Sequence, residues 1–131
     1  MKNTGKLLRI LLALALVLVL LPQIAPDAQA ADSAGKCGEN LTWSFDEATG
    51  ELTITGTGDM DDYDFDFDAQ EATAPWNSFA SQIRKLSLPQ GLTRIGSYAF
   101  FNNTSLSGDL IIPDGVTSIG DYAFKGCIGL S

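Results

Sequence analysis

The sequence predicts a β-rich solenoid, a stack of short strands and short helical turns that is preceded by an N-terminal β-hairpin cap. Two observations predict this class. From Leu88 onward the chain repeats itself with a period of 24 residues. Ahead of the repeat, residues 41–54 alternate apolar and polar side chains on either side of a turn, which is typical of a hairpin.

The repeat aligns residues 88–107 with residues 112–131 without a gap. A unit of this size cannot cover its own apolar edges, so neighbouring units must stack. A stack offers a broad surface and not a pocket, which favours binding over catalysis. The identical pairs are Pro89/Pro113, Gly91/Gly115, Thr93/Thr117, Ile95/Ile119, Gly96/Gly120, Tyr98/Tyr122, Ala99/Ala123, Phe100/Phe124, Leu106/Leu130 and Ser107/Ser131.

Residues 1–30 have the features of a secretory signal peptide. Basic residues at positions 2, 6 and 9 precede an apolar run over residues 10–21, and Ala28-Gln29-Ala30 is a small-residue cleavage site. The run is too short to cross a hydrocarbon core of ~30 Å as a helix. We predict cleavage after Ala30 and a secreted or cell-surface location. An uncleaved membrane anchor is the alternative.

The composition of the mature chain excludes several classes of function. After residue 30, 5 basic and 15 acidic side chains remain, so the formal charge is −10. Such a surface repels phosphate backbones, because nucleic-acid binding depends on basic groups that displace counterions. The chain has no histidine, which is the usual base of nucleophilic triads and the commonest zinc ligand.

The mature chain is predicted to begin with a linker over residues 31–36, followed by an N-terminal cap region over residues 37–82. Within the cap region, residues 41–45 and 52–54 are predicted strands, and residues 46–50 supply the turn. Two strands alone are marginally stable in water, so the hairpin needs an apolar partner. The open end of the repeat stack offers one.

Residues 59–71 contain seven acidic side chains among thirteen residues, interleaved with Tyr63, Phe65 and Phe67. A calcium site is the sharpest hypothesis, but the EF-hand spacing fails, since a loop starting at Asp64 puts Ala69 where glycine belongs. A different calcium site and a rigid carboxylate pair for glycoside hydrolysis are weaker alternatives. We predict a solvated acidic loop with aromatic side chains partly anchored on the cap.

Short elements complete the cap and the repeats. Residues 76–82 are predicted to form one or two helical turns after Pro75, with Trp76, Phe79 and Ile83 buried. In the repeats, the alternation ending at Pro89 and at Pro113 predicts successive strands. A second extended stretch follows over residues 92–95 and 116–119. Ser97 and Asp121 are then expected to cap a single helical turn in each repeat.

The two cysteines are predicted to be unpaired. Cys127 occupies a position where a repeat packs a small apolar group inside, and Cys37 lies at the far end of the mature chain. A disulfide requires Cα atoms within about 7 Å, whereas a linear stack separates its ends.

The repeat unit, with proline and glycine followed by T-x-I-G-x-Y-A-F, resembles the BspA-type leucine-rich repeat of bacterial surface proteins. The match covers residues 89–131, and the segments at 37–43, 56–60 and 75–78 resemble the region that often precedes such repeats. The resemblance implies a leucine-rich repeat stack with parallel strands on one face, and a role in adhesion or protein binding. Arrays of this family usually run longer, so we interpret residues 83–131 as about two repeats, incomplete at the C-terminus.

We therefore expect a secreted or cell-surface interaction module without catalytic residues, cofactor or metal. The expected partner is an extracellular protein or matrix macromolecule, not nucleic acid, and no stable membrane span remains after cleavage. The alternatives are an accessory N-terminal module of a larger secreted enzyme, and a carbohydrate-binding domain that uses Trp43, Trp76 or Tyr63 as a platform. The candidate interaction face consists of the outward side chains of the predicted strands, Lys85, Ser87, Asp109 and Ile111.

Overall fold

The structure is a computed structural model that describes residues 33–130. The predicted signal peptide, the first two residues of the predicted linker and Ser131 lie outside the described residues. Within residues 33–130, no helix is long and apolar enough to cross a membrane.

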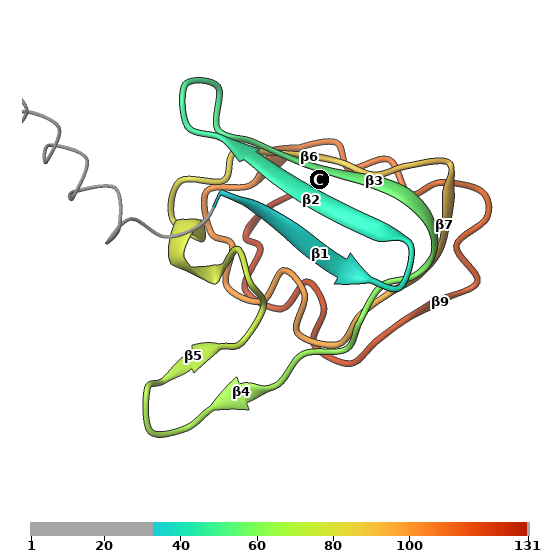
Figure 1. Cartoon of the computed structure of the whole chain (residues 1–131). Helices are drawn as coiled ribbons and strands as arrows, with labels where there is room; N and C mark the ends of the chain where they lie inside the picture. Colours follow the sequence, from blue (N-terminus) through green and yellow to red (C-terminus); the bar gives the residue numbers. More distant parts are fainter. Residues whose placement is uncertain (1–32, 131) are drawn as a thin grey trace, which may run out of the picture. The chain divides into compact units, whose positions relative to one another are not determined.

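Six strands form one sheet in the order β1-β2-β3-β7-β9, with β6 paired to another part of β3 (Figure 1). The first three strands, which are antiparallel neighbours, are β1 (Ala34–Gly38), β2 (Leu41–Asp46) and β3 (Glu51–Asp59). The next three pair in parallel, and they are β6 (Lys85–Ser87), β7 (Gly91–Ile95) and β9 (Ser118–Ile119).

Two further pairs of strands lie outside this sheet. The antiparallel pair is β4 (Phe65–Asp66) with β5 (Glu71–Ala72), which projects from the rest of the chain (Figure 1). The parallel pair is β8 (Ser107–Gly108) with β10 (Gly129–Leu130). Among the described residues, helix is confined to one 3-10 turn, η2 (Asn77–Phe79), where we predicted one or two helical turns over residues 76–82.

The predicted hairpin forms as the alternation indicates. Trp43 pairs with Ile54 and Phe45 with Leu52, and all four side chains are buried on one face. The chain enters this hairpin earlier than expected, since β1 begins at Ala34, inside the segment that we predicted to be a linker. The reason is that backbone groups of this small, polar segment pair with the free edge of β2.

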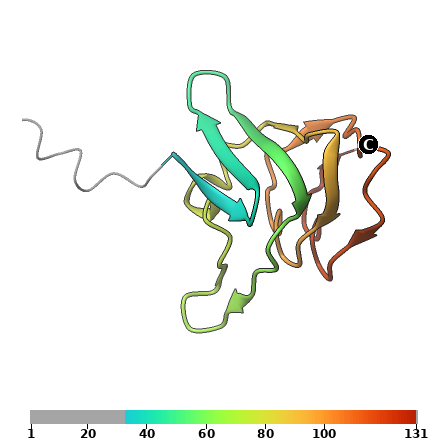
Figure 2. The same ribbon diagram turned by 45° about the vertical axis from the view of Figure 1, so that its right-hand side comes forward.

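Strand β3 joins the hairpin to the repeats. Its first part pairs with β6 and its last part with β7, so that one continuous strand spans both. The same parallel ladder continues beyond β3, because Met60 N–H donates to the Arg94 carbonyl at 3.0 Å and Tyr63 N–H to the Ser97 carbonyl at 2.9 Å. Figure 2 shows β2, β3 and β7 running side by side.

The 24-residue period sets which side chains meet. Phe100 stacks on Phe124 with ring centroids 5.3 Å apart, and Tyr98 lies 5.1 Å from Tyr122, as the repeat predicts. The repeated glycine at positions 96 and 120 allows the units to approach closely. A Cβ atom on Gly120 would collide with the backbone of Ser97 in the preceding repeat. Close stacking therefore explains why glycine recurs at this position of the repeat.

The predicted helical turns do not form. Residues 97–102 and 121–126 are non-helical turns, and the second residue of each is a tyrosine in the left-handed region, at φ 56° for Tyr98 and 58° for Tyr122. Ser97 and Asp121 cap no helix. Instead, the Asp121 N–H donates to the Ser97 hydroxyl across the two repeats, at 3.2 Å. Bonding between repeats replaces bonding within a turn.

A cluster of buried aromatic rings connects the hairpin, η2 and the repeats. Trp76 is fully buried, contacts the ring of Trp43 edge-on at 5.7 Å and stacks on Phe100 at 5.5 Å. Its indole Nε1–H donates to the Ala99 carbonyl at 2.7 Å. Phe45 and Phe79 stack beside this cluster, with centroids 4.5 Å apart. The described part of the chain thus shares one core.

Both cysteines are free thiols, and they differ in exposure. Burial, with the neighbouring Asp61 carboxylate, raises the pKa of Cys37 to about 12. Burial also raises the pKa of Cys127, but this thiol is only partly buried, and its S–H donates to the Phe100 carbonyl. An unfolded thiol ionises near 9.0, so stability contributed by the neutral Cys37 is present below that pH and is lost as the pH rises towards about 12.

We expect iodoacetamide at about pH 8 to modify Cys127 faster than Cys37 in the native protein, because the thiolate is the reactive form. Mass spectrometry of the native and the denatured, unreduced protein measures this difference. The denatured sample should carry two modified thiols. A denatured monomer without modified thiols would establish a disulfide.

Candidate interaction face

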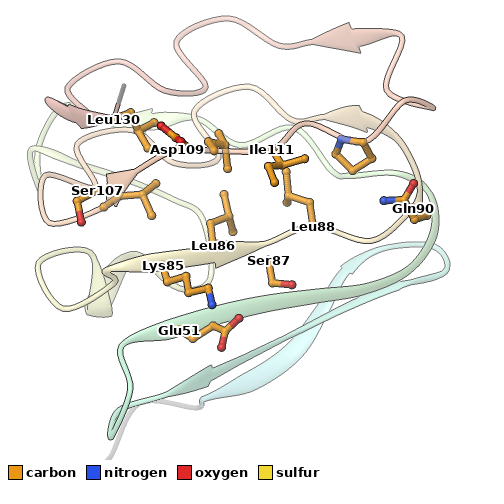
Figure 3. Close-up of a pocket in the computed structure, with 13 residues that line it drawn as sticks. Glu51, Lys85, Leu86, Ser87, Leu88, Gln90, Ser107, Asp109, Ile111 and Leu130 are labelled. Carbon is orange, nitrogen blue, oxygen red and sulfur yellow. The ribbon is translucent and has the colours of Figure 1, made fainter.

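The four residues of the predicted interaction face line one hollow of ≈ 330 Å³ (Figure 3). Lys85 and Ser87 come from β6, and Asp109 and Ile111 come from the segment that follows β8. Sequence positions 24 residues apart thus meet at one place, although only the first pair lies in a strand.

The hollow forms because the second predicted strand is absent. Residues 109–112 form no ladder. Just before them, β8 pairs with β10, and the Ser107 N–H donates to the Arg84 carbonyl at 3.3 Å. The repeat places Lys85 and Asp109 side by side on neighbouring strands, but Asp109 lies outside the strands of the structure. The segment leading to Pro113 leaves the sheet and borders the hollow.

The chain departs from the sheet at Gly108, where β8 ends. The φ of Gly108 is 84°, a value that is readily adopted only by glycine. The segment that follows Gly108 borders a concave surface on the strand face.

The floor of the hollow is apolar and its rim is polar. Leu86, Leu88 and Leu110 are half-buried in it, and Leu106 is fully buried below. At the rim Lys85 lies opposite Glu51 of β3 in the parallel ladder, and both side chains appear side by side in Figure 3. Ile111, which lies across the hollow next to Leu88 (Figure 3), is 78% exposed. The hollow can hold an apolar side chain while its rim hydrogen-bonds or pairs with the flanking residues.

The hollow also contains residues that the sequence reasoning missed. Glu51 and Leu130 line it, and neither was among the residues that we predicted for this face. No sequence signal indicated that the first part of β3 pairs with β6.

The side chains proposed as carbohydrate platforms are not accessible. Trp76 is fully buried, Trp43 is 4% exposed, and Tyr63 is half-buried with its ring against Trp76. A sugar ring cannot stack on rings that already pack in the core, so this form of the carbohydrate hypothesis is wrong. Across residues 33–130, no group of three or more His, Cys, Asp and Glu side chains is arranged to hold a metal ion.

The acidic segment is more ordered than a solvated loop. Asp62 pairs with Arg94 at 2.9 Å and accepts the Ser97 N–H at 2.9 Å. The hydrogen bond from the Ser97 backbone is the main cause, and that from Arg94 the second, of a lowered pKa of the Asp62 carboxyl. Asp59 accepts a hydrogen bond from Thr93 at 2.6 Å. Two of the seven acidic residues therefore bind the first repeat.

The sequence model described as the BspA type leucine rich repeat region matches residues 64–131, just over half of the chain. The chain belongs to this family. A crystal structure of a leucine-rich repeat protein from Eubacterium ventriosum is similar to it, with a TM-score of 0.59 and 28% sequence identity, over 71% of this chain and 23% of that chain. No curated protein matches the sequence at a significant level.

The BspA-type assignment agrees with the described fold, which is strand-rich and has almost no helix. It also explains a position inside the repeat. Leucine-rich repeats carry asparagine or cysteine at one inward position, and the aligned residues here are Asn103, which is buried, and Cys127. Because the chain spans less than a quarter of the Eubacterium ventriosum protein, the function of a whole BspA-type protein does not transfer to it directly.

Proposed function

We propose that this BspA-type chain is a secreted or cell-surface interaction module that binds an extracellular protein or matrix macromolecule and catalyses no reaction. The observation that carries the proposal is the meeting of Lys85, Ser87, Asp109 and Ile111 around one hollow. Members of the family are typically secreted or exposed on the bacterial surface, and leucine-rich repeat families are generally non-catalytic.

The proposed contact is an apolar side chain of the partner inserted among Leu86, Leu88 and Leu110. Interfaces combine an apolar centre with a polar rim, and their binding energy is concentrated in a few residues that fill pockets. The hollow has this composition, with Lys85 and Glu51 at its rim. Ile111 supports the proposal further, since a large apolar side chain that is 78% exposed contributes little to the fold.

The proposal includes a solenoid in which the N-terminal hairpin caps the repeats. Three features support the cap: the parallel pairing of β3 with β6 and β7, the edge contact of Trp43 with Trp76, and the stack of Phe45 on Phe79. A cap of this kind covers the apolar edge of the first repeat, which a repeat stack requires for solubility.

The double change Lys85→Glu with Ile111→Asp tests the binding proposal. It reverses one rim charge and removes the exposed apolar group, so we expect binding to weaken by about tenfold or more. The melting temperature should change by less than about 4 °C, because both side chains are exposed. Surface plasmon resonance against a panel of purified extracellular-matrix proteins measures the binding.

The matched control is Lys36→Glu with Ile128→Asp, which makes the same two chemical changes at exposed residues outside the hollow. The control should bind like the unchanged chain. Equal binding by both double variants would exclude the hollow as the interface. Hydrolytic activity of the purified chain would favour the enzyme alternative.

A further inference from the structure

A second surface, which shares no residue with the hollow, consists of aromatic rings that the core does not use. We call it the aromatic patch. A shallow depression of ≈ 220 Å³ marks its place, and its lining residues are Phe65, Phe67, Tyr98, Phe101, Tyr122 and Lys125.

The rings of the aromatic patch form a connected series. Phe65 is its centre, because it lies 5.1 Å from Phe67, 5.3 Å from Phe101 and 6.3 Å from Tyr98. Tyr98 in turn lies 5.1 Å from Tyr122. The patch therefore joins the β4–β5 hairpin to both repeats.

The aromatic patch is exposed to a degree that folding does not explain. Phe67 is 76% exposed and Tyr122 is 53% exposed, and none of the five rings belongs to the buried core cluster. Contiguous exposed apolar surface of this kind marks interaction sites.

The repeat itself shows which chemical group the rings accept. Phe101 and Lys125 are equivalent positions 24 residues apart. Phe101 packs against Tyr98 with centroids 5.3 Å apart, and one repeat later the Lys125 ammonium lies over the Tyr122 ring at 5.2 Å. The face of this repeated tyrosine thus holds an aromatic ring in one repeat and a cation in the next.

The charge around the aromatic patch has the complementary sign. Asp64, Asp66 and Asp68 alternate with Phe65 and Phe67 and are all exposed, and Asp121 directly precedes Tyr122. Lys125 is the one basic residue that lines the depression. A cation near Phe67 therefore meets aromatic faces and several carboxylates. The Lys125 ammonium lies at the other end of the aromatic patch, over Tyr122.

We propose that the aromatic patch binds a basic segment of a partner protein by stacking its arginine side chains on the exposed rings. Arginine fits better than lysine because its planar guanidinium both stacks on aromatic faces and pairs with carboxylates. Sugars fit less well, since a neutral sugar brings no positive charge to the exposed carboxylates that surround the rings.

The binding of a fluorescein-labelled peptide of alternating arginine and serine to the full chain, followed by fluorescence anisotropy, tests the proposal. Phe67→Ala should raise the Kd about threefold to fivefold, which corresponds to the loss of one exposed cation–π contact. Lys125→Glu should lower the Kd by about twofold to fivefold at low salt, because it removes the competing cation. A peptide with citrulline in place of arginine should bind much more weakly.

Two controls separate the aromatic patch from general acidity of the surface. Ile128→Ala removes an equally exposed apolar side chain outside the patch and should leave the Kd unchanged. Asp68→Asn should weaken binding more than Asp114→Asn, which neutralises an exposed carboxylate elsewhere. Unchanged binding by Phe67→Ala, or equal binding of the citrulline peptide, would overturn the proposal, and neither result would bear on the hollow.

Discussion

Replacing Phe100 by alanine should lower the free energy of unfolding by about 3 to 5 kcal/mol, the usual cost of truncating a buried phenylalanine. The side chain is fully buried and stacks between Trp76 at 5.5 Å and Phe124 at 5.3 Å. Truncation therefore leaves a cavity between the Trp76 ring, which the indole hydrogen bond to Ala99 holds, and the Phe124 ring of the next repeat. Urea denaturation followed by tryptophan fluorescence measures the loss.

Phe67→Ala is the matched control for this change. It removes the same side chain from a position that is 76% exposed, and it should cost less than about 1 kcal/mol. If Phe100→Ala also costs less than about 1 kcal/mol, Phe100 is not buried between repeats and the register of the stack is wrong.

Replacing Trp76 by alanine should be as severe, with a loss of about 3 to 5 kcal/mol. Trp76 is the ring through which the hairpin, the acidic segment and the first repeat meet, since it contacts Trp43, Tyr63 and Phe100. Its removal also leaves the buried Ala99 carbonyl without the indole donor. Thermal unfolding monitored by circular dichroism measures the loss and shows whether one transition remains.

Trp76→Phe separates the two contributions of this residue. Phenylalanine keeps a ring in the core but cannot donate to Ala99, so the loss should be about 1 to 3 kcal/mol, the cost of one unsatisfied buried acceptor. An alanine variant no less stable than the phenylalanine variant would mean that Trp76 does not connect the hairpin to the repeats.

The strand-rich architecture and the contacts between repeats could be predicted because each rests on a periodic signal. Alternation of period two places Trp43, Phe45, Leu52 and Ile54 on one face of a hairpin, whatever the chain does elsewhere. The 24-residue period brings Phe100 onto Phe124 because identical units that stack must place identical side chains together.

The details that shape the hollow were harder to predict. The alternation of apolar residues before Pro113 predicts a strand that does not form, because alternation indicates which side chains share a face but not whether the backbone finds a partner strand. The pairing of β3 with both β6 and β7 is equally hidden, since it joins segments of unlike sequence.

The turns after Ser97 and Asp121 show where a local sequence signal fails to predict the structure. Serine or aspartate before a short apolar run is a helix-capping signal, and it predicts a helical turn. In a stack, however, the backbone groups of this segment bond to the next repeat, as Phe100 N–H does to the Ala123 carbonyl at 2.8 Å. Bonding to a neighbouring repeat outweighs the local preference, and the tyrosines take a strained conformation as a consequence.

A double-mutant cycle on Phe100 and Phe124 tests the stacking of the repeats most directly, because the positions of the hollow and of the aromatic patch both depend on it. The two alanine changes should be coupled by about 0.5 to 1.5 kcal/mol, the energy of one aromatic pair. The control cycle pairs Phe100 with Ile119, an exposed aliphatic residue that cannot form an aromatic pair. The two alanine changes of this cycle should be additive within about 0.5 kcal/mol. Additivity of Phe100 and Phe124 would contradict the 24-residue stack.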